Sequence, residues 1–227
     1  MRDESLFIHD YVNQTTLHPM GFFLLVIMSV TVFILNRRYA IVPILIMACF
    51  VAPAQRIVVF GLDFNLIRIL VLIGWARVAL RGETAGFEWK SLDKMIIAWS
   101  MSGLLAYVAL REGAAGAFIY KAGTLFDSLG MYFLFRCLIR EIEDIRHLVI
   151  SLLVLSLPVA FFLLWEKQTG RNVFSVFGGI PEWTEIRYGK LRAQGAFAHA
   201  ILAGCFWASQ LPLFIALWWN GERRLLA

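Results

Sequence analysis

The chain has 227 residues, of which 60% are hydrophobic and only 16% are charged. Soluble domains carry about 25% charged residues, so this composition argues against a water-soluble globular domain and for a membrane protein. The formal net charge of +5 at pH 7 does not indicate nucleic-acid binding, because the basic residues flank apolar segments instead of forming a patch with interleaved aromatic side chains; anionic membrane lipids are the more natural partners.

Apolar stretches recur along the chain and are separated by short charged segments. A transmembrane helix needs about 20 mainly apolar residues, and seven stretches are candidates. They run from Met20 to Leu35, Tyr39 to Val51, Phe64 to Leu80, Met95 to Leu110, Ala117 to Leu138, Leu148 to Trp165 and Ala198 to Trp219. The second is short and proline-containing, so six spans also fit. The sequence predicts an all-α, polytopic bundle of transmembrane helices that forms a single domain over residues 1–227.

Basic residues in alternate loops predict the orientation of this bundle. The positive-inside rule places short loops rich in Lys and Arg in the cytoplasm. Those loops contain Arg37 and Arg38; Arg77, Arg81, Lys90 and Lys94; Arg136, Arg140 and Arg146; and Arg223 and Arg224. We therefore expect the amino terminus outside and the carboxyl terminus in the cytoplasm, as an odd number of spans requires.

The predicted external loop, residues 166–197, breaks this rule. Its cations outnumber its three acidic residues and are Lys167, Arg171, Arg187, Lys190 and Arg192. Binding of an anionic group would explain why they stand on the translocated side. The alternative is that a loop of this length is translocated regardless of its charge.

The end of this loop contains a possible pyrophosphate clamp, because Arg187, Lys190 and Arg192 are followed by Gly195 and His199. Arginine holds phosphate oxygens through paired donors, and glycine permits close approach of the backbone. If the last helix begins near Arg192, Arg192 and His199 share one helix face. A plainer interpretation is an interfacial arginine belt with a histidine at the start of a helix.

The run from Arg192 to His199, Arg-Ala-Gln-Gly-Ala-Phe-Ala-His, resembles the Arg-x-x-Gly-x-Phe-x-His-Pro signature of the O-antigen ligase and polymerase superfamily, with Ala200 in place of the proline. Further segments resemble its exopolysaccharide-associated branch in the same order. They are Gly61 to Arg68, Arg77, Arg81 to Glu83, Phe126-Asp127 and Tyr132 to Arg136. Members have roughly ten to twelve spans, each of about 20 residues, so we expect the chain to be the amino-terminal portion of a larger protein.

The resemblance implies a glycosyltransferase of the bacterial inner membrane, which transfers a glycan from undecaprenyl pyrophosphate in surface polysaccharide biosynthesis, without cofactor or metal and alongside other assembly proteins. Arg187, Lys190, Arg192, Gly195 and His199 would bind the substrate. His199 is also a candidate base because histidine is the side chain most often used in general acid–base catalysis, although the resemblance places the general base in the remaining part of such proteins. Ligase and polymerase activity both stay open.

Arg68, Lys121 and Asp127 are ionisable residues inside predicted spans. Charges within a membrane are costly and pair with one another or line a path. We expect Asp127 to pair with Arg68 or Lys121. The alternative function is a membrane transporter or channel component in which the three residues line a path, and a third possibility is a catalytically silent scaffold of a polysaccharide export assembly.

Other residues indicate architecture only. Arg77 and Arg136 are expected to be snorkelling anchors near the inner ends of their spans. The cysteines at positions 49, 137 and 205 show no metal-ligand spacing, so no metal is expected. A glycosidase-like pair among Glu166, Glu182 and Glu185 is conceivable, but nothing in the sequence places two of them across a sugar.

Overall fold

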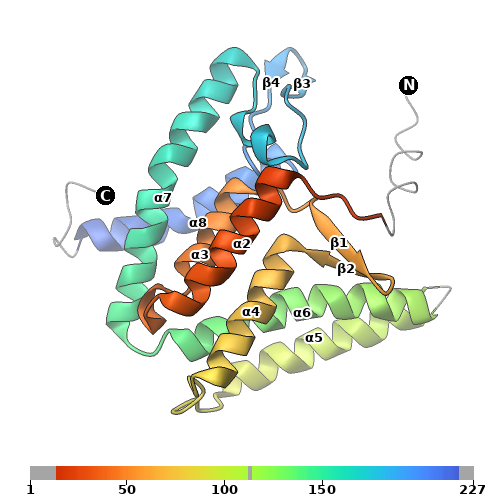
Figure 1. Cartoon of the computed structure of the whole chain (residues 1–227), viewed down its shortest axis with the longest axis vertical. Coiled ribbons are helices and arrows are strands. Elements are labelled where there is room, and N and C mark those ends of the chain that lie inside the picture. Colours follow the sequence, from red (N-terminus) through yellow and green to blue (C-terminus); the bar gives the residue numbers. More distant parts are fainter. Residues whose placement is uncertain (1–13, 112–113, 220–227) are drawn as a thin grey trace.

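The computed structural model describes residues 14–111 and 114–219 and confirms the all-α prediction. Its helices and strands are shown in Figure 1. The α-helices are α2 (Pro19–Ile34), α3 (Val42–Phe50), α4 (Leu66–Leu80), α5 (Ser91–Ala109), α6 (Ala114–Leu138), α7 (Ile142–Thr169) and α8 (Ala200–Trp219). Two short 3-10 helices are η1 (Arg37–Tyr39) and η2 (Val173–Phe177), and two hairpins are β1 (Arg56–Val59) with β2 (Leu62–Asn65) and β3 (Ile186–Arg187) with β4 (Lys190–Leu191).

Each predicted span overlaps one α-helix, but several helices extend beyond their apolar stretches. The helix α7 starts with a capping box formed by Glu141 and Asp144, and it continues through Glu166 and Lys167 until Gly170 adopts a left-handed conformation at φ 73°. The predicted external loop therefore begins later than expected, because its first residues form the last turn of α7.

Three helices, α5, α7 and α8, are long and apolar enough to cross a membrane, and α2 is a shorter apolar helix. Only 17%, 22% and 11% of the apolar windows in α5, α7 and α8 are buried within the protein. A helix that is apolar all round belongs in an apolar environment. Their exposed surfaces are thus suited to contact with lipid.

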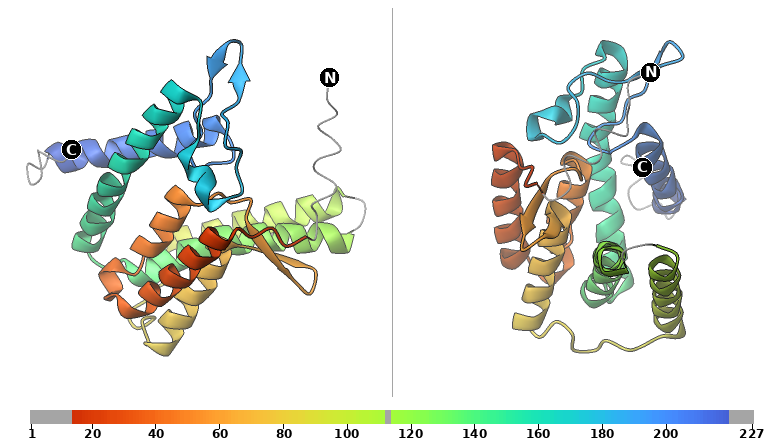
Figure 2. Two further views of the ribbon diagram at one scale, coloured as in Figure 1. Left: turned by 45° about the horizontal axis from the view of Figure 1, so that its top comes forward. Right: turned by 90° about the vertical axis from the view of Figure 1, so that its right-hand side faces the viewer.

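The main hydrophobic core lies where α2, α3 and α4 pack against α6 and α7. Its buried side chains include Met47 from α3, Leu70 and Val71 from α4, and Leu134 from α6. Outside this core, α5 lies along α6, as both views of Figure 2 show, and α8 contacts α7.

Arginine side chains bind free carbonyl groups at the ends of two helices. Arg77 does so at the end of α2, and Arg37 at the end of α6. Arg77 is fully buried, donates to the carbonyl oxygens of Val32 and Leu35, and pairs with Glu83 at 2.9 Å. The expectation that Arg77 is a snorkelling anchor is wrong, because its guanidinium satisfies carbonyls left unbonded at the end of α2. The guanidinium of Arg136 is also bound within the protein, because it forms a salt bridge with the buried Asp93 at 3.1 Å.

The orientation prediction depends partly on segments outside the described residues. The amino terminus and the basic pair Arg223 and Arg224 both lie there. Within the described part, the ends of α2, α4 and α6 and the start of α7 carry the predicted cytoplasmic cations Arg37, Arg77, Arg136 and Arg140.

Candidate functional site

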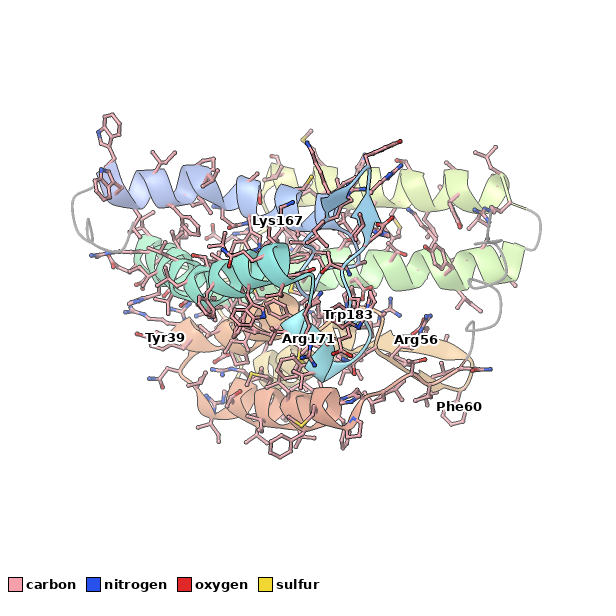
Figure 3. All side chains as sticks on the ribbon, turned by 90° about the horizontal axis from the view of Figure 1, so that it is seen from above. Tyr39, Arg56, Phe60, Lys167, Arg171 and Trp183 are labelled. Atoms are coloured by element: carbon pink, nitrogen blue, oxygen red, sulfur yellow. The ribbon has the colours of Figure 1, made fainter. Side chains whose placement is uncertain are left out.

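The segment between α7 and α8 forms a folded loop at one end of the molecule (Figure 1). Its hairpin pairs Ile186 with Leu191 and Arg187 with Lys190. Tyr188 and Gly189 form the turn, with φ values of 52° and 71°. Two consecutive positive φ angles are the requirement of a tight type I′ hairpin turn. At the base of the loop, the backbones of Arg171 and Trp183 form an isolated antiparallel β-bridge. Both residues are labelled in Figure 3.

Four cations line one cavity beside this hairpin, which we call the cationic cavity. Its volume is about 730 Å³, and its lining consists of Lys167, Arg187, Tyr188, Lys190, Leu191, Arg192 and Ala193. The structure thus brings together the three cations predicted for the clamp. It adds a fourth, Lys167, from the last turn of α7, and Figure 3 labels this residue.

The charge of the cationic cavity is not balanced within the described part of the chain. No carboxylate there lies within 4.0 Å of a charged nitrogen of its four cations. Lys167 donates to the carbonyl oxygen of Leu191 at 2.7 Å, and Arg187 lies over the ring of Tyr188 at 5.6 Å. Arg187 and Lys190 are directly opposed across the ladder, which is unfavourable for like charges. An anion in the cavity would relieve this repulsion.

The segment that follows Arg192 is fixed by two buried polar side chains. Glu166 accepts hydrogen bonds from the backbone N–H of Gln194 at 3.1 Å and of Gly195 at 2.9 Å, and from the Thr184 hydroxyl at 2.8 Å. Asn172 donates to the carbonyl oxygen of Gly195 at 2.8 Å. The wall of the cationic cavity formed by Arg192 and Ala193 is therefore tied to the end of α7.

Two residues predicted to bind the substrate lie outside the lining of this cavity. Gly195 adopts φ +60°, and its N–H is occupied by Glu166. His199 is exposed and immediately precedes α8, which begins at Ala200. The condition under which Arg192 and His199 would share a helix face is not met, because residues 192–199 are not helical.

An apolar groove adjoins the cationic cavity between α7 and α8. Its volume is about 450 Å³, and it is lined by Ser156, Ala160, Leu163, Ala193, Ala200, Ala203, Gly204, Trp207, Leu211 and Phe214. Small side chains such as Ala160, Ala203 and Gly204 create the space. Ala193 lines both the groove and the cationic cavity, so the two spaces are neighbours that share this residue.

The ionisable residues Arg68, Lys121 and Asp127, predicted to lie within spans, are found away from this site. Arg68 binds Asp127 through Nε and Nη2, each at 2.7 Å from a carboxylate oxygen, and Gly123 leaves room for the guanidinium, 3.2 Å from where a Cβ would stand. This is one of the two pairings expected. Lys121 instead lies over the ring of Tyr107 at 5.5 Å. None of the three residues predicted for a path lines the cationic cavity or the apolar groove.

Sequence reasoning did not single out Lys167 and Glu166 for this site. In the sequence, Lys167 is one of several loop cations, and Glu166 is a member of a conceivable carboxylate pair. A signal was present in the adjacency of an acid and a base directly after the apolar run that ends at Trp165. The partners of Glu166 are 18 to 29 residues away, so the sequence alone could not identify them.

In comparisons with known proteins, no protein-family model, no curated protein and no solved structure matches the chain.

Proposed function

We propose that the chain binds a membrane lipid that carries a pyrophosphate-linked glycan, as part of a multi-pass glycan ligase- or polymerase-like protein of the bacterial inner membrane. The observation that carries this proposal is the junction at Ala193 between a cavity lined by four cations and an apolar groove between two apolar helices. A ligand with an anionic head and a hydrocarbon chain fits both spaces at once.

The cationic cavity suits a pyrophosphate head group. Two guanidinium groups supply paired donors for phosphate oxygens, whereas the two ammonium groups act as point charges. Arg187, Lys190 and Lys167 are exposed and Arg192 is half-buried, so a head group could enter from the aqueous side without unfolding the loop.

The apolar groove suits the hydrocarbon chain of the same ligand. Its walls come from two of the three helices that are long enough to cross a membrane. The groove volume of about 450 Å³ falls within the roughly 300–1,000 Å³ of typical ligand sites, and the chain could continue beyond it into the bilayer.

The proposed reaction transfers the glycan from the carrier pyrophosphate to an acceptor hydroxyl. The bond between the sugar and the pyrophosphate breaks, and the carrier pyrophosphate leaves with the bonding electron pair. A new glycosidic bond to the acceptor oxygen forms, and the hydroxyl proton passes to a base outside the described residues. Cations fixed around the leaving group stabilise the negative charge that develops on it, and the loop orients the donor for attack. We assign no base within the described residues; His199 is exposed and lies outside the cavity lining.

We also propose that all seven α-helices of the described residues cross the membrane or return through it, with the cationic cavity on the outer side. The shortest is α3, whose nine residues rise only about 14 Å, less than half of a hydrocarbon core of about 30 Å. Pro43, Ile44, Leu45, Met47 and Cys49 of α3 are buried. Because α3 contacts protein on most sides, its length need not match the lipid.

The test is binding of an undecaprenyl-pyrophosphate analogue to the purified chain in detergent. Charge-assisted contacts contribute roughly 1.5–3 kcal/mol each, so we expect the double variant Arg187→Ala plus Arg192→Ala to bind at least about tenfold more weakly. Arg171→Ala is the matched control, because Arg171 belongs to the same loop but pairs with Glu182 at 2.7 Å and does not line the cavity.

The outcome that contradicts the proposal is absence of binding by the wild-type chain, or equal binding by the double variant. Undecaprenol, which lacks the pyrophosphate, serves as a second probe. Its binding should be weak and should not respond to the double substitution.

A further inference from the structure

We infer that Glu166 is the positioning residue that sets the width of the cationic cavity and thereby makes it select pyrophosphate over a single phosphate. This inference rests on the proposed function, since it concerns the same site. Glu166 touches neither the cavity nor a ligand; it acts through the backbone that carries Arg192 and Ala193.

The geometry around Glu166 links the two walls of the cavity. One wall is the end of α7, which carries Lys167, and the other is the segment from Leu191 to Ala193. Lys167 holds Leu191 from the first wall, and Glu166, the preceding residue, holds the N–H groups of Gln194 and Gly195. Two adjacent side chains therefore fix the opposite wall at both of its ends.

The bonds of Glu166 are well protected from solvent. Its side chain is fully buried, and Asn172, which is 1% exposed, binds the carbonyl group of Gly195 from the other side. Both backbone polar groups of Gly195 are thus held by buried side chains. Buried hydrogen bonds of this kind fix a backbone position, because leaving any one of the groups unpaired costs free energy.

The carboxylate form is needed for this arrangement. An ionised carboxylate only accepts hydrogen bonds and can serve all three donors that surround Glu166, whereas the amide of glutamine has one accepting oxygen and a donating NH₂ group. In Glu166→Gln, a donor would face the N–H of Gln194 and the Thr184 hydroxyl, or the N–H of Gly195.

Pyrophosphate and orthophosphate respond differently to the width of such a cavity. A pyrophosphate is longer than a single phosphate and can contact cations from several of the segments that line the cavity at once, so its affinity depends more strongly on their relative positions. A single phosphate can bind the cations of one segment alone. A shift of the Arg192 wall should therefore weaken pyrophosphate binding and leave orthophosphate binding nearly unchanged.

The experiment titrates the intact chain in detergent with inorganic pyrophosphate and with orthophosphate, comparing the wild type with Glu166→Gln and Thr184→Val. Loss of a hydrogen bond to a charged group corresponds to about a tenfold effect. We expect Glu166→Gln to lower the ratio of pyrophosphate to orthophosphate affinity about tenfold by this measure. Thr184→Val removes one bond of Glu166 but leaves those to Gln194 and Gly195, so the ratio should stay within about twofold of the wild type.

Each outcome has a distinct meaning. A wild-type chain that binds neither anion contradicts the proposed function itself. A wild-type chain that prefers pyrophosphate, with an unchanged ratio in Glu166→Gln, overturns the inference alone. Equal losses in both variants would mean general loosening of the loop and would overturn it as well.

A second variant covers the case in which Glu166→Gln fails to fold. Gly195→Ala strains a residue at φ +60° and brings a Cβ to 3.2 Å from Leu163, so we expect it to shift the backbone whose N–H binds Glu166. It should reduce the affinity ratio in the same direction, and an unchanged ratio in a folded Gly195→Ala chain would contradict the inference.

Discussion

Arg68 and Asp127 show how single residues accommodate charge within the helices. The side chains are 17% and 34% exposed, and both ends of the carboxylate are bound by the guanidinium. Asn65 adds a weaker bond from its Nδ2 to Asp127 at 3.4 Å while its oxygen caps the first turn of α4. The pair therefore joins the start of α4 to the middle of α6.

We expect Asp127→Asn to destabilise the chain by roughly 1–3 kcal/mol, because Arg68 would keep its charge and lose its partner. Thermal unfolding in detergent measures the effect. Lys121→Ala is the control. It removes a cation that lies over an aromatic ring, a contact worth about 0.5–1 kcal/mol at exposed sites.

Equal effects of the two substitutions would contradict this interpretation of the pair. A changed ion flux through vesicles containing Asp127→Asn, with unchanged stability, would instead support the alternative function in which Arg68, Lys121 and Asp127 line a path.

At the scale of residues, the sequence identifies the cations of the candidate site but not what holds them. Arg187, Lys190 and Arg192 lie close together because a tight hairpin turn separates the first two by only two residues. Glu166 and Asn172 are polar residues without a motif. Their importance depends on long-range contacts and on full burial, and neither can be derived from one sequence.

Among the elements, the loop between α7 and α8 is docked on the start of α2 and the end of α3 by Gln55. This fully buried amide donates to the carbonyl oxygen of Phe177 at 2.7 Å and accepts from the N–H of His18 at 3.0 Å. Gly21 lies against the same amide, because a side chain there would overlap it. Gln55 thus connects the first helix of the described chain to the loop that carries the cations.

Gln55→Leu should loosen the loop while leaving the helices intact. The substitution leaves the N–H of His18 and the carbonyl of Phe177 without a partner, which costs about 1–3 kcal/mol of free energy. About 1.4 kcal/mol corresponds to a factor of ten, so limited proteolysis within residues 170–199 should accelerate by roughly tenfold. Gln210→Leu is the matched control, because its amide bonds only to Phe206 and Ser209 on the same helix. Unchanged cleavage in Gln55→Leu would show that the loop is held by other contacts.

Hydropathy locates the middle of each helix and misses the ends. The apolar stretch from Leu148 to Trp165 becomes a 28-residue helix, α7, because a polar capping box extends its start and Gly170 stops it. In the same way, Lys90 and Asp93 start α5 before its apolar stretch. Polar first and last turns are stabilised by capping and by the helix dipole, neither of which a hydropathy average detects.

For the whole molecule, the proposed topology can be tested by single cysteines added on opposite sides. Tyr188, 92% exposed at the hairpin tip, and Ala85, exposed in the loop between α4 and α5, are suitable positions. A thiol reagent that does not cross membranes should label Tyr188→Cys in intact cells and Ala85→Cys only after permeabilisation. Both variants are made in a Cys205→Ala background, which is also the control, because Cys205 is exposed whereas Cys49 and Cys137 are buried. Labelling of both positions in intact cells would contradict the proposed topology.

The all-α class was predictable because the chain is apolar enough for a membrane and its apolar runs have the length of helices and not of barrel strands. The number of crossings was less predictable. α3 is short and buried, and its role depends on the helices around it and not on its own hydropathy.

The opposed pair Arg187 and Lys190 links occupancy of the loop to its stability. Any ligand that binds only the folded loop stabilises it by mass action, and the repulsion between two facing cations gives an anion particular influence over that equilibrium. A bound carrier head group would hold the hairpin closed around itself. Departure of the pyrophosphate would restore the repulsion and weaken the same hairpin, so the loop would be most stable while a carrier head group is bound and least stable after it has left.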